Sequence, residues 1–379
     1  MKVAIAHDFI RHGGAEKCLE QFHQLWPEAP IHTLLDERNP MTAGWDVRSS
    51  WLQGLVPPRY YRWPLVLYPG MVDRLRVDPD LDLLVTSSVS WMKSLRAPAG
   101  VPHLCYLYRP MMFGYERQEV FLATYPRAVR PLLRRIVQRI VRWDQRHADA
   151  PDLYVACSGW IAQLVRKHYR REAEVLYPPV RIEPFVEAGK RTAPGDYFLT
   201  ALRLESYKRV DIAVEACTRL GLPLKVAGRG PELERLRQIA GPTVEFLGFV
   251  SDEQLVELVA GCRAFLFPSE EDFGIAPVEA MAAGRPVVAL GRGGPAETVV
   301  PGLSGVHFPE QTADAVVAAV RELDRMPVDA AVIRATAEGY SEAAFRAGFL
   351  ALAQRLVAEG PRAHNVGVPR PVPGAAPRS

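Results

Sequence analysis

Short apolar runs alternate with segments of helical periodicity along nearly the whole chain, and this alternation limits the fold more than any other feature. It is typical of a parallel sheet flanked by helices, because parallel strands need a crossover connection. The runs form two series, with strands predicted at 3–6, 31–35, 83–86, 103–106 and 153–156, and then at 197–200, 224–227, 244–247, 264–267 and 286–289. The sequence therefore predicts an α/β protein with two domains, each built on a parallel sheet flanked by helices.

A proline-rich stretch at residues 176–196 lacks periodicity and separates the two series, so we interpret it as a linker. A chain of 379 residues is also too long for one typical core. We expect domains at 1–180 and 181–340, followed by a helix at 341–360. Residues 361–379 have little apolar content and are expected to be disordered.

Composition excludes several classes of protein. The net charge of +3 does not indicate nucleic-acid binding, and the five cysteines have no paired spacing, which favours free thiols in a reducing compartment. The first residues, MKVAIAHD, reach an acid after an apolar run that is too short for a signal peptide. No apolar run in the sequence reaches membrane-spanning length. We expect a cytoplasmic protein, with peripheral contact at the inner face of the membrane as an alternative.

Metal ligands are not indicated either. The nine histidines show no metal-ligand spacing with cysteine or glutamate. The stretch DPDLDLL (78–84) resembles an Asp-x-Asp metal motif, but its acids precede a predicted strand and so lie at the amino end, away from the expected cleft. No metal site is predicted.

Ligands of open parallel sheets bind beyond the carboxyl ends of the strands, so the loops that follow strands are the candidate sites. Gly13 and Gly14 stand between the first strand and a helix, where a glycine pair either admits phosphate or sugar closely or makes a tight turn. Gly228 and Gly230 follow a strand of the second series. They suggest a nicotinamide-cofactor loop, but Leu233 stands where that fingerprint has its third glycine.

Two cations follow the first strand of the second series. Arg203 and Lys208 lie between that strand and a helix of regular period. A guanidinium fork and an ammonium point charge at a strand end are suited to clamp a pyrophosphate. The alternative is that both are solvated loop cations.

The stretch SEEDFGIAPVEAMAAG (269–284) brings acidic residues to an expected helix start. There the N–H groups of Gly274 and Ile275 lie at the positive end of the helix, with Glu271 on the incoming loop and Glu279 in the first turn. Carboxylates repel phosphate but accept hydrogen bonds from sugar hydroxyls. The pattern predicts a pocket in which cations and N–H groups hold a diphosphate and the glutamates hold hydroxyls on either side of it.

These motifs together resemble the retaining glycosyltransferases of family 4, which have the GT-B fold of two Rossmann-like domains that face a central cleft. The most specific motif of the resemblance is EDFGIAPVE (271–279), and three further motifs agree in order and spacing: RLESYKRVD (203–211), AGRGPE (227–232) and FPSEEDFG (267–274). It implies that the C-terminal domain binds a nucleotide-diphosphate sugar and that the N-terminal domain binds a saccharide or lipid-linked acceptor. It also implies that the final helix returns to the N-terminal domain.

The resemblance implies roles for individual residues. Arg203 and Lys208 would hold the diphosphate, Glu279 the ribose and Glu271 the transferred sugar, while Phe273, Gly274 and Ile275 belong to the same binding loop. Enzymes of similar sequence use GDP-mannose in bacterial polysaccharide synthesis, which favours mannosyl transfer. Enzymes of this kind need neither a cofactor nor a metal, and the leaving diphosphate takes the proton of the acceptor hydroxyl.

The chain departs from the family pattern at one point. Many relatives read C-Y-x-H-T-P-M, whereas this chain reads CYLYRPM (105–111), so Tyr108 replaces a histidine that contacts the donor sugar and Arg109 replaces a threonine. Both are candidate site residues, and a changed sugar, a changed acceptor or a weakened activity would follow.

At the tip of the first strand, Asp8 either orients an acceptor hydroxyl or caps the local structure.

Residues 127–148 form a basic amphipathic pattern with an apolar stripe and seven arginines. The helix either faces the core with a solvated basic side or docks on anionic lipid near a lipid-linked acceptor.

Two other functions of the protein stay open. A sugar-nucleotide epimerase of the same fold would convert the donor without an acceptor, and a non-catalytic protein would only bind sugar nucleotides.

Overall fold

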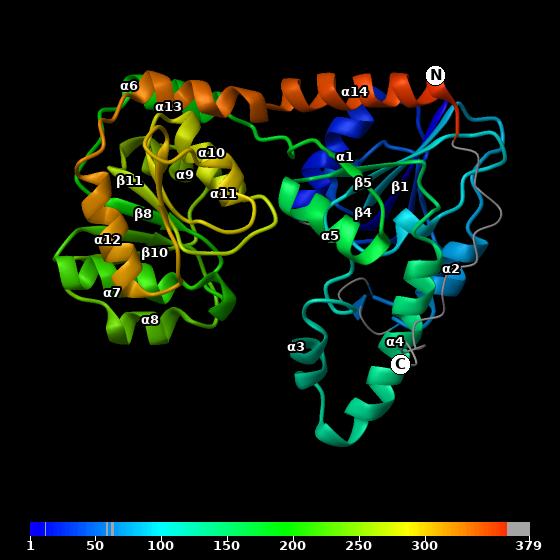
Figure 1. The fold of residues 1–379 in the computed structure, drawn as a ribbon, viewed down its shortest axis with the longest axis horizontal. Helices are drawn as coiled ribbons and strands as arrows, with labels where there is room; N and C mark the ends of the chain where they lie inside the picture. Colours follow the sequence, from blue (N-terminus) through cyan, green and yellow to red (C-terminus); the bar gives the residue numbers. More distant parts are fainter. Residues whose placement is uncertain (12, 58–59, 62–63, 362–379) are drawn as a thin grey trace, which may run out of the picture.

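Two sheets covered by helices make up this computed structural model, which describes residues 1–11, 13–57, 60–61 and 64–361 (Figure 1). The first sheet has the strand order β3-β2-β1-β4-β5-β6-β7 and the second β10-β9-β8-β11-β12-β13, and every pairing is parallel. The predicted class, two Rossmann-like domains with helices on the sheet faces, is confirmed.

The strands are β1 Val3–Ile10, β2 Ile31–Asp36, β3 Val47–Ser49, β4 Leu83–Ser88, β5 His103–Leu107, β6 Leu153–Ala156, β7 Ala173–Val175, β8 Phe198–Ala201, β9 Leu224–Ala227, β10 Val244–Gly248, β11 Ala264–Phe267, β12 Val287–Leu290 and β13 Gly305–Phe308. The helices are α1 Gly14–Leu25, α2 Tyr68–Arg74, α3 Gln118–Ala123, α4 Arg130–Arg146, α5 Gly159–Tyr169, α6 Glu183–Arg191, α7 Val210–Leu220, α8 Leu233–Ile239, α9 Asp252–Gly261, α10 Ile275–Ala282, α11 Pro295–Thr298, α12 Ala313–Leu323, α13 Ala330–Ala337 and α14 Glu342–Glu359.

Three strands were missed by the sequence analysis: β3, β7 and β13. β3 and β7 are three-residue strands at the two edges of the first sheet, and the last two residues of each are exposed. An edge strand with side chains in water needs no apolar run. β13 begins with a glycine and contains a histidine, so it also lacks the pattern that marks the buried strands.

The stretch at 176–196 is not a plain linker. It contains α6, which packs on α9 and α10, and Phe185 on this helix lies in the core of the second domain. Val180, just before α6, forms an isolated parallel bridge with Ser341. The two crossings between the domains therefore run side by side. The predicted tail largely falls on residues 362–379, outside the described residues.

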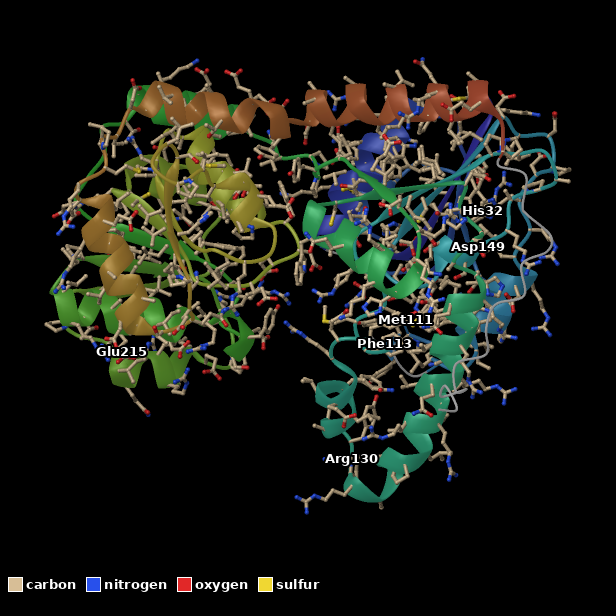
Figure 2. All side chains as sticks on the ribbon, in the orientation of Figure 1. His32, Met111, Phe113, Arg130, Asp149 and Glu215 are labelled. Atoms are coloured by element: carbon tan, nitrogen blue, oxygen red, sulfur yellow. The ribbon has the colours of Figure 1, made fainter. Side chains whose placement is uncertain are left out.

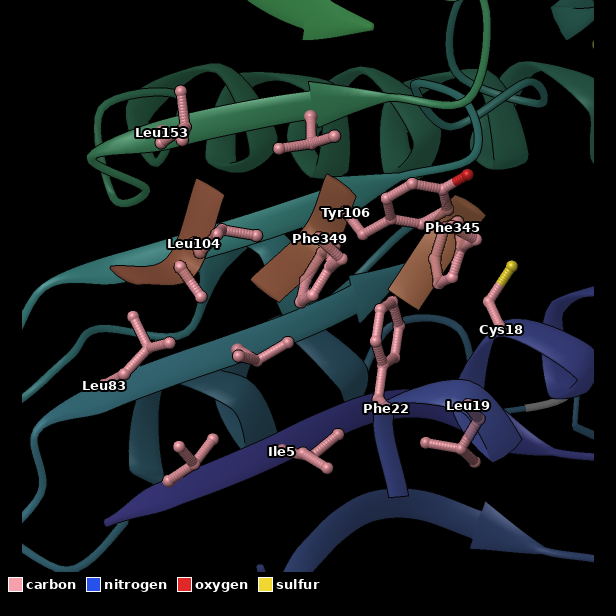
Figure 3. Close-up of a cluster of buried hydrophobic side chains, with 14 of the residues drawn as sticks. Ile5, Cys18, Leu19, Phe22, Leu83, Leu104, Tyr106, Leu153, Phe345 and Phe349 are labelled. Carbon is pink, nitrogen blue, oxygen red and sulfur yellow. The ribbon is translucent and has the colours of Figure 1, made fainter. Parts of the chain in front are cut away.

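Helix α14 completes the core of the first domain, although it comes at the far end of the described chain. It runs along the first domain in Figure 1, and Figure 3 shows Phe345 and Phe349 of α14 against Phe22 of α1 and Tyr106 of β5. The ring centroids of Phe22 and Phe349 lie 4.4 Å apart. The predicted return of the final helix to the N-terminal domain is confirmed.

Each sheet reverses its strand order once, between β1 and β4 in the first sheet and between β8 and β11 in the second. In doubly wound folds, ligands bind beyond the carboxyl ends of the strands at such a switch point. The loop after β1 carries Gly13 and Gly14, the loop after β8 carries Arg203, and the loop after β11 carries Glu271. The candidate loops chosen from sequence therefore occupy both switch points.

Helices α3 and α4 project away from the first domain as a pair (Figure 1). Figure 2 shows Met111 and Phe113 near the base of this projection and Arg130 near its end. The apolar stripe predicted for residues 127–148 is buried only in part: Val137 and Ile140 are buried, whereas Leu132 is 60% exposed. Among the described residues, no helix combines the length and the apolar character needed to cross a membrane.

Candidate functional site

The loop after β8 presents its two cations differently. Arg203 is exposed and donates a hydrogen bond to the Tyr207 hydroxyl at 3.0 Å. Lys208 ends a short 3-10 turn and is buried, and its Nζ pairs with the carboxylate of Glu271. The two residues predicted to hold the diphosphate therefore lie on one loop. One of them, Lys208, already contacts Glu271, the residue predicted to bind the transferred sugar.

Gly228 and Gly230 allow the loop after β9 to pack directly on this cation loop. A Cβ at Gly228 would lie 1.9 Å from the Leu202 carbonyl oxygen, and one at Gly230 would lie 2.3 Å from that of Leu204. The Leu204 N–H donates to the Arg229 carbonyl at 2.9 Å. In this structure the close approach that these glycines allow is to protein backbone, and it fixes the course of the segment that carries Arg203.

The loop after β11 turns sharply into α10. Gly274 has φ +91°, in the left-handed region that favours glycine, and α10 begins at Ile275. In the part of the chain that the structure describes, the N–H groups of Gly274 and Ile275 have no acceptor. Glu279 lies in the second turn of the helix, not the first as expected, because the helix starts at Ile275. Two donors at a helix N-terminus are thus free for an anion.

Glu271 is the most constrained residue of this loop. Its Oε1 accepts a hydrogen bond from the Ser269 hydroxyl at 2.5 Å in addition to its pairing with Lys208. Its backbone carbonyl accepts from the Gly294 N–H at 2.8 Å, and a Cβ at Gly293 would lie 2.5 Å from the same oxygen. The glycine loop after β12 therefore supports Glu271.

Glu279 is the opposite case. Among the described residues, its carboxylate has no hydrogen-bond donor, although it is only partly exposed. Burial raises its pKa above the ordinary glutamate value, and the ammonium of Lys17, from the first domain, lowers it. A carboxylate without a donor at this position is free to accept hydrogen bonds from a ligand.

Phe273 turns away from these polar groups. It is buried and packs between Tyr177 and Tyr340, with ring centroids 5.7 Å and 5.8 Å away. The aromatic side chain therefore anchors the loop in the core of the second domain. Only its backbone is left to approach a ligand.

The glycine loop of the first domain faces α10 across the gap between the domains. A Cβ placed on Gly14 would lie 3.8 Å from Cδ1 of Ile275, so the two loops nearly touch. Gly13 has φ −165°, which any residue adopts, so its backbone does not require glycine. The structure thus brings together Gly14 and Ile275, which were predicted for opposite sides of the cleft.

Asp8 behaves as the structural cap of the two interpretations given above. It is buried, and its carboxylate accepts backbone N–H groups from Val89, Ser90, Trp91 and Met92 at 2.5–3.2 Å and the Ser88 hydroxyl at 3.3 Å. These donors fix the segment after β4. No oxygen of Asp8 is left for an acceptor hydroxyl.

Tyr108 is engaged in the same way. Its hydroxyl lies 2.9 Å from Ser87 Oγ and donates to the Ala15 carbonyl at 3.0 Å, while its ring packs edge-on against Tyr106. Burial raises the pKa of this phenol well above its ordinary value. The hydroxyl therefore ties the glycine loop and the start of α1 to β4, a role that the motif comparison did not predict.

Arg109 reaches across the gap to the second domain. Its Nη1 lies 2.6 Å from Oδ1 of Asp272, the residue between Glu271 and Phe273. Burial raises the pKa of Asp272 to about 6, while the charge of Arg109 opposes that rise. The motif around Arg109 marks it as a candidate site residue, but nothing in the sequence connects it to Asp272, which is 163 positions away.

A second contact between the domains was missed altogether. The carboxylate of Glu297, on α11, accepts the backbone N–H groups of Gly159 and Trp160 at 2.7 Å and 2.6 Å and the Tyr177 hydroxyl at 3.2 Å. It therefore caps the N-terminus of α5 in the other domain. The signal was present in GRGGPAE (291–297), a glycine loop that follows a predicted strand.

The described residues contain no group of three or more histidine, cysteine, aspartate or glutamate side chains placed to hold a metal ion. Asp80 and Asp82, of the motif before β4, lie at the amino edge of the sheet, where Asp80 pairs with Lys2 at 2.5 Å. This is the location expected from the sequence. All five cysteines are buried and free.

Comparison with known proteins agrees with this geometry. Residues 186–338 match the family model described as glycosyl transferases group 1. The chain is 28% identical over 225 residues to the alpha-1,3/1,6-mannosyltransferase ALG2 of Mus musculus, covering 47% of this chain and 53% of that protein. It is 33% identical over 223 residues to the D-inositol 3-phosphate glycosyltransferase of Mycolicibacterium smegmatis, covering 52% and 50%. The chain thus spans about half the length of the curated relatives it matches.

Solved structures extend the likeness to the whole chain. The crystal structure of Alr3699/HepE from Anabaena in complex with UDP superposes with a TM-score of 0.67 at 18% identity, covering 94% of this chain and 100% of that one. At such identity the likeness concerns the fold alone. The chain therefore has the GT-B fold, and its residues 186–338 carry the sequence pattern of glycosyl transferases group 1.

Proposed function

We propose that the protein is a retaining glycosyltransferase that moves a sugar from a nucleotide-diphosphate sugar to a hydroxyl of a saccharide or lipid-linked acceptor. One observation carries the proposal. At the switch point of the second sheet, the exposed Arg203 and the unpartnered N–H groups at the start of α10 lie near two carboxylates of opposite status, Glu271 held by protein donors that include Lys208 and Glu279 held by none among the described residues. A diphosphate needs the donors and the hydroxyls of a nucleotide sugar need the acceptors.

The family match and the glycosyltransferase relatives support the same class of reaction. Mannose is the sugar that we favour, in line with the mannosyltransferase relative, which matches about half of its own length. In the reaction, the acceptor oxygen forms a bond to the anomeric carbon on the face that the diphosphate leaves, and the leaving phosphate takes the hydroxyl proton. Arg203, Lys208 and the N–H groups of Gly274 and Ile275 would stabilise the charge that develops on that phosphate. The step as written involves no metal ion.

Binding of free nucleoside diphosphate tests the site directly. Arg203→Ala and Lys208→Ala should each weaken it about 10- to 150-fold, because a charge-assisted hydrogen bond contributes roughly 1.5–3 kcal/mol. The matched control is Arg237→Ala, which removes an arginine paired with Glu234 on α8, outside the candidate loops. Calorimetry that finds unchanged affinity in both site variants would remove the diphosphate from this loop.

The variant Glu271→Gln distinguishes a contact with the transferred sugar from a contact with the nucleotide. If Glu271 contacts the transferred sugar, the variant should lose turnover while nucleoside diphosphate still binds. The donor is found first by thermal shift with a panel of GDP and UDP sugars, since a ligand of the native state raises its stability. If the protein is a transferase, this donor should stay unchanged when it is incubated with the protein in the absence of an acceptor. An isomerised donor would point to an epimerase, and binding without either product would point to a non-catalytic protein.

We also propose that the projecting α3–α4 pair contacts an anionic membrane near a lipid-linked acceptor. The exposed apolar side chains Val120 and Leu132 lie on this pair and Val129 lies just before α4, and exposed arginines such as Arg135 and Arg139 lie on α4. Co-sedimentation with anionic vesicles should fade as salt rises. Absence of co-sedimentation at low salt would leave the helix with its solvated basic face only.

A further inference from the structure

A cavity of about 820 Å³ opens in the first domain, away from the cleft. Its lining includes Arg76, Arg96, Trp143, Arg146 and His147. A second hollow of about 610 Å³ shares Arg96, Arg146 and His147 with it, so the two adjoin; Asp149, labelled in Figure 2, lines the second. Both are formed by the segments that lead into β4, β5 and β6. They therefore lie at the amino edge of the sheet, whereas the candidate active site lies at the carboxyl edge.

The three arginines of this cavity have no carboxylate partner among the described residues. Arg76 donates only to the backbone carbonyls of Asp73 and Leu75, at 2.7 Å and 2.9 Å, and Arg146 only to the carbonyl of Arg142, at 3.3 Å. Arg96 makes no ion pair within the described chain. Elsewhere on the surface, arginines are commonly paired, as in Arg166 with Glu172. Asp149 and Asp152 line the second hollow, so the excess of positive charge belongs to the larger cavity, where three arginines face one carboxylate.

Asp73, the one carboxylate in the lining of the larger cavity, is already engaged. Its Oδ1 accepts the indole N–H of Trp143 at 3.0 Å and lies 3.2 Å from Nε2 of His147. The remaining wall is largely apolar and includes Val72, Leu75 and Pro98. The cavity lining thus combines three arginines that have no carboxylate partner among the described residues with a largely apolar remainder.

We propose that this cavity is a second ligand site that binds a phosphate group attached to a partly apolar body. Guanidinium forks match phosphate oxygens in pairs, and three of them offer more donors than the two oxygens of a carboxylate can accept. Arg96 and Arg146, which line both hollows, hold the phosphate, and Arg76 closes one wall. The site is separate from the proposed transfer reaction and does not depend on it. A soluble phosphomonoester and the phosphate of a lipid headgroup present the same chemistry.

Glycerol 3-phosphate is the probe for the soluble source. Calorimetry should show binding that weakens about tenfold in Arg96→Gln and in Arg146→Gln, since each removes a charge-assisted contact. The matched control is Arg166→Gln, on α5 of the same domain, which is exposed but lies outside both cavity linings and outside the α3–α4 pair. Hydrogen exchange locates the ligand, with protection expected at residues 94–101 and 143–150. Unchanged affinity in both variants, or protection confined to 203–208 and 271–279, would overturn the proposal.

Vesicles of phosphatidylcholine with and without phosphatidic acid distinguish the two sources. If the natural ligand is a headgroup, vesicles with phosphatidic acid should bind the parent protein and Arg166→Gln more tightly than Arg96→Gln and Arg146→Gln. If it is a soluble phosphomonoester, glycerol 3-phosphate should show the same order of affinities and the vesicles should not. Equal affinity of all four proteins for both probes would contradict the site. Both arginines are exposed, so their replacement should leave the fold intact.

Discussion

The two faces of the cleft use their polar groups in opposite ways. On the first domain, Asp8 and Tyr108 are saturated by protein partners: a run of backbone N–H groups in one case, Ser87 and Ala15 in the other. On the second domain, Glu279 and the N–H groups at the start of α10 have no partner among the described residues. Asp8 and Tyr108 are thus preassembled, whereas Glu279 and these N–H groups are left ready for a ligand, beside Glu271 and Lys208, which pair with each other. Substitutions on the first should cost stability, and substitutions on the second should cost binding.

Asp8→Ala should show the largest effect. It would leave several buried N–H groups without an acceptor, each at a cost of ~1–3 kcal/mol, and we expect the free energy of unfolding to fall by ~3–5 kcal/mol. Urea unfolding followed by circular dichroism measures the change. Asp80→Ala, which removes an exposed aspartate paired with Lys2, should leave the stability close to that of the parent. Equal stability of the two variants would contradict the structural role of Asp8 and therefore the proposed contrast between the two faces.

Glu279→Gln should have the reverse profile. Replacing a carboxylate oxygen that accepts ligand hydroxyls should weaken nucleoside diphosphate binding by ~1.5–3 kcal/mol. The free protein should be at least as stable as the parent, because the raised pKa means that the ionised carboxylate costs the folded state free energy at neutral pH. Calorimetry and urea unfolding check the two halves. A loss of stability with unchanged affinity would place Glu279 with the preassembled groups.

Tyr108→Phe sharpens the comparison on a smaller scale. The hydrogen bonds to Ser87 and Ala15 predict a loss of about 1 kcal/mol in stability, with transfer rate and nucleoside diphosphate affinity close to those of the parent. The family comparison predicts otherwise, since a hydroxyl that replaces a sugar-contacting histidine should matter for turnover. Single-turnover kinetics decide between them: a slower rate at unchanged nucleotide affinity would support the sugar contact.

Asp272 provides the smallest effect, a change in titration only. Its pKa of about 6 lies above that of a solvated aspartate, so proton uptake favours the arrangement in which it is buried. The ionised carboxylate costs this arrangement free energy above about pH 6, and the cost is relieved as the pH falls toward 4. Arg109→Gln should raise the pKa further, and Arg117→Gln should raise it less, because Arg109 makes the larger opposing contribution. Carboxyl-carbon NMR follows the titration; a lowered pKa in Arg109→Gln would contradict the ion pair.

The parts of the site that the sequence predicts are those governed by local pattern. Apolar runs mark the buried strands, and loops that follow strands must lie at one edge of a parallel sheet, so the positions of Arg203, Glu271 and Gly14 at that edge were predicted correctly. Edge strand β7 was missed because its exposed residues need no such pattern. The partners of Asp8 were not predictable either, since a buried carboxylate and a ligand-binding one look the same until the backbone around them is placed.

Contacts between residues remote in sequence fall outside any local rule. Arg109 and Asp272 each stand in a motif, but nothing in either motif requires the other. Glu297 belongs to a glycine loop that the strand-end rule would have included, yet its acceptor role depends on the start of α5, 138 positions away from it. Such pairs depend on how the two domains meet, which composition and periodicity do not describe.

The path of α14 has a consequence for biosynthesis. Phe345 and Phe349 fill the space beside Phe22 and Tyr106, so the first half of the chain leaves the ribosome with a face of its core uncovered. At ~5–20 residues per second, translation from β7 to the end of α14 takes roughly 10–35 s. The second sheet, whose core lies between Val180 and Ala337, can close within that interval. The domain that is synthesised first is therefore the one completed last, and it needs protection from aggregation while it waits.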